Sequence, residues 1–298
     1  MSSINAQTQI VGIIGWPLHH SLSPVMHNAA FSHLGLNWVY LAFPFPPHYL
    51  DDAVHGLRVL GIRGFNVTAP FKQAIFPYLE QASEVAKALG AVNTVVVRED
   101  PSSGRRWLYG ENTDVDGFLR STSAYLEQIP HDHAIILGAG GAARAVAYAL
   151  CKTGFRAVSF VTRHLERGQT LLKEIERWEY STTFNLISFR EVDRLTRVED
   201  VSVLINATPV GTWPETDISP LPESFSLPAH WLVIDLVYNP LKTHLLKQAE
   251  SVGAVGINGL GMLVHQGALS FRAWCGLDAP IEVMHQACLE AICSTKEA

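Results

Sequence analysis

The chain has little of what a nucleic-acid or membrane partner requires. Its 22 Lys and Arg are outnumbered by 28 Asp and Glu, the formal net charge is −6, and the basic residues form no run. Nucleic acids and anionic membranes both attract a basic footprint. No stretch approaches the length of a membrane span, and the N-terminus lacks the basic start and apolar core of a signal peptide. We therefore expect a small-molecule partner, with no nucleic acid and no membrane.

Cysteine is also scarce. The four cysteines, Cys151, Cys275, Cys288 and Cys293, include no C-x-x-C pair, so we expect reduced thiols and a cytoplasmic protein rather than a disulfide scaffold. The 13 histidines contain no H-E-x-x-H or similar ligand spacing, so we predict no metal site. A homodimer is compatible with the sequence.

What the chain does have is the composition of a folded protein. Its 298 residues, 48% hydrophobic and 17% charged, suit two globular domains. Short apolar runs alternate with longer amphipathic stretches, which is typical of parallel sheets with crossover helices. We predict an α/β fold. In the first part we expect strands at 10–15, 38–43, 64–67 and 92–97, and helices at 25–34 and 49–60.

A second alternating series begins near residue 133. We expect strands at 134–137, 157–161, 201–205 and 232–236, with a helix between each consecutive pair. The turn-like segment GENTD before a helical pattern at 115–126 places the domain boundary at about Asp114. From Asn258 onward the chain again has a helical pattern, which either completes the second domain or returns to the first.

The segment HAIILGAGGAA (133–143) has the pattern of a dinucleotide-binding loop. A strand runs into Gly138-x-Gly140-x-x-Ala143, and a helical pattern follows. Gly138 permits the tight turn, Gly140 lets the backbone approach a pyrophosphate, and Ala143 lets the helix pack on its strand. The helix N-terminus offers free N–H groups to the anion. We therefore predict a Rossmann-type, doubly wound parallel sheet in the second part of the chain.

The end of the next strand distinguishes NAD from NADP. An acidic residue there binds the ribose 2′-hydroxyl, whereas arginine accommodates a 2′-phosphate. The strand ends in Thr162-Arg163-His164, and Arg167 follows one helical turn after Arg163. Two planar guanidinium groups suit one phosphate, so NADP is the expected cofactor. The alternative is that both arginines are solvated surface residues, one of them neutralised by Glu166.

The first part of the chain carries polar groups where its strands end. Ser21 and Ser23 can bind an anionic or polyol ligand, although Ser23 could instead be an N-cap with Pro24 at the first helical position. Lys72 stands at the start of a helix, where the dipole disfavours a cation, and a lysine can exchange a proton with a substrate oxygen. Taken alone, it could also be an ordinary surface residue.

Further polar residues complete a hypothetical site between the domains. Asn93 and Thr68 could bind hydroxyl groups, while Lys72 and Asp114 could form an acid/base and orienting pair.

Eight segments together resemble the ordered motifs of the shikimate dehydrogenase family, and they cover residues 15–266. They are HSLSP, NVTAPFK, GAVNT, GENTD, GAGGA, NATPVGT, DLVYNP and NGLGMLVHQ. The resemblance implies a substrate-binding and catalytic domain at 1–113, an NADP-binding domain at 114–258, and C-terminal helices at 259–298 that return to the first domain. It implies NADPH-dependent reduction of 3-dehydroshikimate to shikimate, a step of chorismate and aromatic amino-acid biosynthesis.

The resemblance also implies roles for individual residues. Lys72 and Asp114 would be the catalytic pair. Ser21, Ser23 and Tyr238 would hold the substrate carboxylate, and Thr68, Asn93, Asp114 and Gln266 would bind its hydroxyl groups. The implied cofactor residues are Gly138, Ala139, Gly140, Gly141, Ala142, Thr162, Arg163, His164, Arg167, Leu236, Gly259 and Glu84.

The chain departs from the family pattern at two of these positions. Thr162 and His164 flank Arg163 where the family commonly has Asn and Thr, which affects how strictly NADP is preferred. Two other functions stay open: a quinate/shikimate dehydrogenase that uses NAD or NADP, and a non-catalytic nucleotide-sensing protein of the same fold. A serine hydrolase built on Ser21 is disfavoured because no G-x-S-x-G elbow surrounds that residue.

Overall fold

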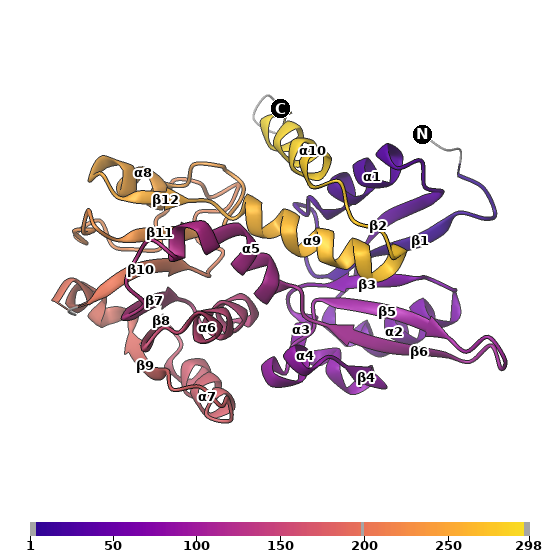
Figure 1. Ribbon diagram of the computed structural model, residues 1–298, viewed down its shortest axis with the longest axis horizontal. Helices are drawn as coiled ribbons and strands as arrows, with labels where there is room; N and C mark the ends of the chain where they lie inside the picture. Colours follow the sequence, from indigo (N-terminus) through magenta and orange to yellow (C-terminus); the bar gives the residue numbers. More distant parts are fainter. Residues whose placement is uncertain (1–3, 198–199, 295–298) are drawn as a thin grey trace. The chain divides into compact units, whose positions relative to one another are not determined.

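The computed structural model describes residues 4–197 and 200–294. The chain divides into two compact units, one formed by Met1–Thr113 with Val264–Ala298 and the other by Asp114–Leu263. Each unit contains one six-stranded sheet, and the labelled strands can be followed in Figure 1. None of the helices in the described ranges combines the length and apolar content that crossing a bilayer requires.

The first unit has a mixed sheet of order β2-β1-β3-β5-β6-β4. β1 pairs in parallel with β2 and β3, whereas β5 runs antiparallel to both β3 and β6. Its strands are β1 (Gln9–Gly15), β2 (Trp38–Pro44), β3 (Gly64–Val67), β4 (Gln81–Ala82), β5 (Thr94–Glu99) and β6 (Arg106–Glu111). Its helices before the boundary are α1 (Ser23–His33), η1 (Pro47–Tyr49), α2 (Leu50–Val59), α3 (Phe71–Ala74), η2 (Phe76–Tyr78) and α4 (Glu84–Leu89).

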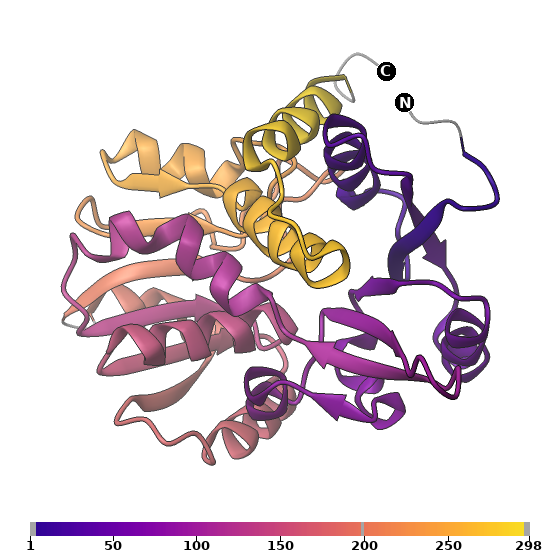
Figure 2. The same cartoon turned by 45° about the vertical axis from the view of Figure 1, so that its right-hand side comes forward.

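The C-terminal helices return to this first unit. The boundary falls within α9 (Leu260–Cys275), and α10 (Ile281–Ser294) packs against α1. Figure 2 shows the yellow C-terminal helix beside the indigo α1. Trp274 of α9 donates from its indole nitrogen to the Val95 carbonyl at 3.0 Å. Side-chain contacts with the sheet therefore fix the returning segment.

The second unit has an all-parallel sheet of order β12-β11-β10-β7-β8-β9. The order reverses between β7 and β10, which is the switch point where doubly wound sheets bind their ligands. Its strands are β7 (His133–Leu137), β8 (Ala157–Thr162), β9 (Thr183–Ser188), β10 (Val201–Asn206), β11 (Leu232–Asp235) and β12 (Val255–Ile257). Its helices are α5 (Asp114–Leu126), α6 (Gly141–Thr153), α7 (Leu165–Ile175), η3 (Phe189–Arg197) and α8 (His244–Ser251). The predicted α/β fold class is confirmed.

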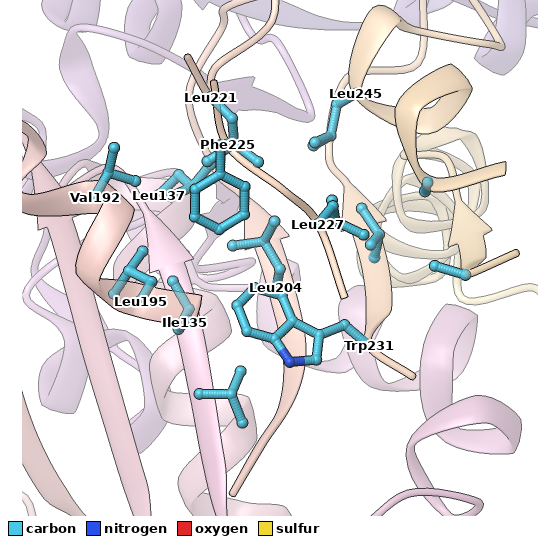
Figure 3. Close-up of a cluster of buried hydrophobic side chains, with 14 of the residues drawn as sticks. Ile135, Leu137, Val192, Leu195, Leu204, Leu221, Phe225, Leu227, Trp231 and Leu245 are labelled. Atoms are coloured by element: carbon cyan, nitrogen blue, oxygen red, sulfur yellow. The ribbon is translucent and has the colours of Figure 1, made fainter. Parts of the chain in front are cut away.

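One predicted helix is absent from the second unit. The segment 207–231 between β10 and β11 is irregular throughout its described length. It contains five prolines, Pro209, Pro214, Pro220, Pro222 and Pro228, and proline lacks the N–H that a helix interior requires. The segment instead packs Leu221, Phe225 and Leu227 into the apolar cluster over the sheet, as Figure 3 shows.

The core of the first unit contains a histidine in an aromatic cluster. His27 of α1 is fully buried and stacks on Tyr40, with ring centroids 4.5 Å apart. Phe31, Phe271 and Trp274 surround the same imidazole. Neither ring nitrogen has a hydrogen-bond partner in the described part of the chain. Burial therefore lowers the pKa of His27 from 6.5 to about 3.

This histidine should make folding stability depend on acid pH. The unfolded chain binds a proton at His27 below pH 6.5 and the folded chain only near pH 3, so stability is full above 6.5 and falls as the pH is lowered. The loss should reach about 2 kcal/mol at pH 5. We expect His27→Phe to remove this part of the pH dependence in urea unfolding curves. His33→Phe, at an exposed position of the same helix, is the control. Equal pH slopes for wild type and His27→Phe would contradict the burial argument.

Candidate active site

The glycine-rich loop joins β7 to α6 at the switch point of the second sheet. Gly138 has a φ of +108°, and a Cβ built there would lie 3.1 Å from the Thr208 methyl carbon. Its N–H donates to the Val161 carbonyl at 2.8 Å. The turn therefore requires glycine at this position, as the sequence pattern predicts.

Gly140 is different, because the chain itself gives no reason for glycine there. Its φ of −95° and ψ of −169° suit any residue, and an added Cβ would meet nothing within 4 Å. Gly140 precedes α6, whose N-terminus has no side-chain cap, so the first N–H groups of the helix stay available to an anion. Ala139, Gly141 and Ala142 are half-buried around it, whereas the next residues of the helix, 143–147, are buried. These features fit a dinucleotide pyrophosphate.

The residues that follow β8 present two exposed arginines. Thr162 is buried, and its hydroxyl oxygen accepts from the His164 N–H at 3.1 Å, which fixes the turn into α7. Arg163, His164 and Arg167 are exposed. Across the described residues, neither arginine forms an ion pair, and Glu166 neutralises neither of them. The arrangement leaves both guanidinium groups available to a phosphate.

A buried polar network supports the loops that follow β10 and β11. Asp235, fully buried at the end of β11, accepts from Asn206 at 2.8 Å, from the Val237 N–H at 3.1 Å and from Thr243 at 2.7 Å. Burial raises the pKa of Asp235, and these hydrogen bonds oppose the shift. Asn206 in turn accepts from the Thr208 N–H and hydroxyl at 3.0 and 2.6 Å. One carboxylate thus positions both loops.

Leu236 and Gly259 adjoin this network. The Leu236 N–H donates to the Asn206 carbonyl, and the Gly259 N–H donates to the Val237 carbonyl, both at 3.0 Å. A Cβ at Gly259 would lie 2.0 Å from the Leu236 carbonyl oxygen. The two predicted cofactor residues therefore lie in direct contact, and only glycine allows the close approach.

We expect Asp235→Asn to destabilise the protein by about 1–3 kcal/mol, because the new amide group would face a donor and leave a buried group unsatisfied. Equilibrium unfolding in urea measures the change. Asp217→Asn, at an exposed position of the 207–231 segment, is the matched control and should leave the midpoint unchanged. An Asp235→Asn midpoint equal to that of the control would contradict the supporting role of the carboxylate.

In the first unit, Asn93 and Gln266 lie together although they are far apart in sequence. Asn93 is buried, and its side-chain oxygen accepts from the Thr113 N–H at 2.8 Å. Its amide nitrogen lies 2.9 Å from the Thr113 hydroxyl and donates to the Gln266 side-chain oxygen at 3.3 Å. The family resemblance implies that Asn93 and Gln266 both bind substrate hydroxyl groups, and the structure places their amides in one hydrogen-bonded group.

Behind these amides lies a second layer of polar residues that the sequence reasoning missed. Asn66 donates to the hydroxyls of Thr94 and Ser270 at 3.1 and 3.0 Å, and those two hydroxyls are 2.7 Å apart. Asn66 also accepts from the Tyr40 hydroxyl at 2.7 Å. All four residues are buried. Polar residues on β3 and α9 at apolar positions are the only signal that the sequence offers for them.

Ser21 and Ser23 lie at the entrance to α1. The alternative that Ser23 caps this helix is wrong, because the helix begins at Ser23 itself and Leu22 occupies the cap position without a side-chain bond. Ser23 is buried. Ser21 is half-buried, and its hydroxyl oxygen lies 3.4 Å from the Ser23 N–H.

Lys72 and Thr68 flank the short turn after β3. The Thr68 carbonyl accepts from the Phe71 N–H at 2.9 Å, and the Lys72 carbonyl accepts from the Val92 N–H at 2.7 Å. The backbone thus fixes Lys72 beside the segment that carries Asn93. α3 has only four residues, and a single helical turn carries little macrodipole. The expected repulsion between Lys72 and the helix dipole is therefore small.

The other predicted site residues, Asp114, Tyr238 and Glu84, are divided between the two units. Asp114 is buried at the first position of α5, and Tyr238 is half-buried after β11, both in the second unit. Glu84 is an exposed residue of the first unit that forms an ion pair with Lys87 at 2.8 Å. Its position at the start of α4 suits an acidic residue without any ligand.

Comparison with known proteins identifies the family. Residues 13–95 match the shikimate dehydrogenase substrate-binding domain, 121–213 match shikimate/quinate 5-dehydrogenase, and 259–289 match the shikimate 5′-dehydrogenase C-terminal domain. A protein named shikimate dehydrogenase (NADP(+)) from Methanopyrus kandleri is 44% identical over 97% of both chains. The chain belongs to the shikimate dehydrogenase family.

Solved structures agree with this family membership. A shikimate dehydrogenase in complex with NADP+ has a TM-score of 0.86 at 40% identity, covering 98% of both chains. The shikimate 5-dehydrogenase of Listeria monocytogenes, solved with shikimate and NAD, has a TM-score of 0.84 at 34% identity, covering 96% of this chain and 98% of that one. The resemblance drawn from the eight motifs is confirmed. Because these two family structures hold different dinucleotides, the fold alone does not select the cofactor.

Proposed function

We propose that the chain is an NADP-dependent shikimate dehydrogenase that reversibly reduces 3-dehydroshikimate to shikimate in the cytoplasm. The observation that carries the proposal is the 44% identity over 97% of both chains to a protein of that name. Arg163 and Arg167, which are exposed and form no ion pair with the residues that the structure describes, support NADP rather than NAD, because each can donate to a 2′-phosphate. The four cysteines, which are free thiols, suit a reducing compartment.

The dinucleotide fits the loop and arginines of the second unit and, when bound, supplies the hydride. Gly138 to Ala142 would bind the pyrophosphate, and Thr162 to Arg167 would bind the adenosine phosphate. Leu236 and Gly259 would flank the nicotinamide end, and Glu84 would add an outer contact. The work of these residues is to hold the cofactor in position, which is the larger part of what a protein contributes to such a transfer.

The chain's remaining residues would bind the substrate and move one proton. Ser21, Ser23 and Tyr238 would hold the carboxylate, while Thr68, Asn93, Asp114 and Gln266 would bind the ring hydroxyls. Lys72 would donate a proton to the C3 carbonyl oxygen as the carbon accepts a hydride, so that C=O becomes CH–OH. Asp114 would orient the neighbouring hydroxyl and Lys72.

The test is product formation by the purified protein. With 3-dehydroshikimate and NADPH, we expect stoichiometric NADPH oxidation and shikimate as the product identified by mass. A protein that binds NADPH without turning it over would instead be a nucleotide sensor of the same fold. The joint presence of Lys72 and Asp114 argues against that alternative, because a sensor requires neither.

A further inference from the structure

An aromatic ring lies beside the first arginine of the phosphate-binding segment. The guanidinium carbon of Arg163 is 4.8 Å from the centroid of the Phe189 ring. This contact follows from strand register, since Thr162 of β8 pairs with Ser188 of β9. Arg163 and Phe189 are the next residues at the carboxyl ends of these two parallel strands, at the edge where doubly wound sheets bind ligands.

The ring of Phe189 is itself held in place by the core. Phe189 is partly buried and packs against the apolar cluster that includes Val192 and Leu195 of η3. Figure 3 shows these two side chains directed toward the sheet residues Ile135 and Leu137. An anchored ring is a fixed platform, so a guanidinium that rests on it loses much of its rotational freedom before any ligand arrives.

The contact leaves the hydrogen-bonding capacity of Arg163 intact. A cation–π contact uses the face of the planar guanidinium, whereas its N–H groups point outward along the edge. Arg163 is exposed and has no acidic partner within the described residues. The ring can therefore orient the arginine without competing for the donors that would bind a phosphate.

We propose that Phe189 is a specificity-determining residue that positions Arg163 for the 2′-phosphate of NADP(H). The inference rests on the proposed function. The ring takes no part in NADH binding through this contact, because NADH lacks the group that Arg163 binds. Phe189 thereby contributes to the preference for NADPH rather than to dinucleotide binding in general.

Steady-state kinetics of Phe189→Leu with NADPH and with NADH test the proposal. Leucine keeps apolar packing against the cluster but has no ring. We expect kcat/KM for NADPH to fall about 3-fold to 5-fold, mainly through KM, with kcat/KM for NADH unchanged. Phe189→Tyr should retain the wild-type preference. The control is Arg194→Ala, which removes a cation from the same η3 helix, where Arg194 pairs with Glu191.

A double-mutant cycle separates positioning from packing. In an Arg163→Ala background, Phe189→Leu should have no further effect on NADPH. An equal loss with both cofactors, or the same loss in the Arg163→Ala background, would overturn the inference and show that Phe189 only supports the fold. If the wild type prefers NADPH and Phe189→Leu prefers it to the same degree, the inference is also overturned. A wild-type protein that shows no preference for NADPH would overturn this inference and the proposed cofactor together.

Discussion

Replacing Lys72 with alanine is expected to lower kcat for shikimate oxidation about 1,000-fold, with little change in substrate affinity. A positioned acid or base typically contributes between 10²-fold and 10⁴-fold to a rate, and Lys72 is the group proposed to exchange a proton with the reacting oxygen. The binding groups Asn93 and Gln266 are hydrogen-bonded to each other and keep their side chains in this variant, so they should still hold the substrate. Steady-state assays give kcat and KM separately.

The controls for this prediction address folding and charge. Lys72→Met keeps the length of the side chain but cannot transfer a proton, and it should lose as much activity as Lys72→Ala. Lys87→Ala removes an exposed, ion-paired lysine from the same unit and should retain turnover. NADPH binding, followed by fluorescence, should be unchanged in all three variants. Turnover by Lys72→Met within 10-fold of wild type would exclude the proposed role.

The second large effect concerns the cofactor. In the double variant Arg163→Ala/Arg167→Ala, kcat/KM for NADPH should fall about 100-fold, because two charge-assisted hydrogen bonds to a phosphate are lost. The same parameter for NADH should change less than about 3-fold, since NADH carries no 2′-phosphate. The preference of the enzyme should therefore move toward NADH.

A matched control for the cofactor prediction is Arg190→Ala/Arg194→Ala, which removes two exposed arginines from the neighbouring η3 helix. This control should keep most of the NADPH preference. If the Arg163→Ala/Arg167→Ala variant lost activity equally with NADPH and NADH, the arginines would serve general binding or folding, and the 2′-phosphate assignment would be wrong.

The sequence predicted features that depend on local geometry. Gly138 was predictable because a tight turn after a buried strand requires a positive φ. The positions of Arg163 and Arg167 were predictable, because one follows directly after a strand and the other comes one helical turn later. The absence of a helix at 207–231 could have been predicted as well, since the five prolines of this segment are evident in the sequence.

The sequence could not predict features that join distant segments. The hydrogen bond between Asn66 and Ser270 spans 204 residues, and it exists only because α9 returns to the first unit. The isolated position of His27 among four aromatic rings likewise depends on α1, β2 and α9 packing together. Asn66, Ser270 and His27 have no local sequence pattern that distinguishes them from ordinary polar residues. Phe189 reaches Arg163 only through the register of β9, a strand that the sequence reasoning missed.

One assay tests the central claim most directly. The purified wild-type protein should be assayed with shikimate and with quinate, each with NADP+ and with NAD+. We predict that kcat/KM is highest for shikimate with NADP+, and that replacing either the substrate or the cofactor lowers it at least about 10-fold. Comparable values for quinate, or a preference for NAD+, would contradict this account and identify a quinate/shikimate dehydrogenase instead.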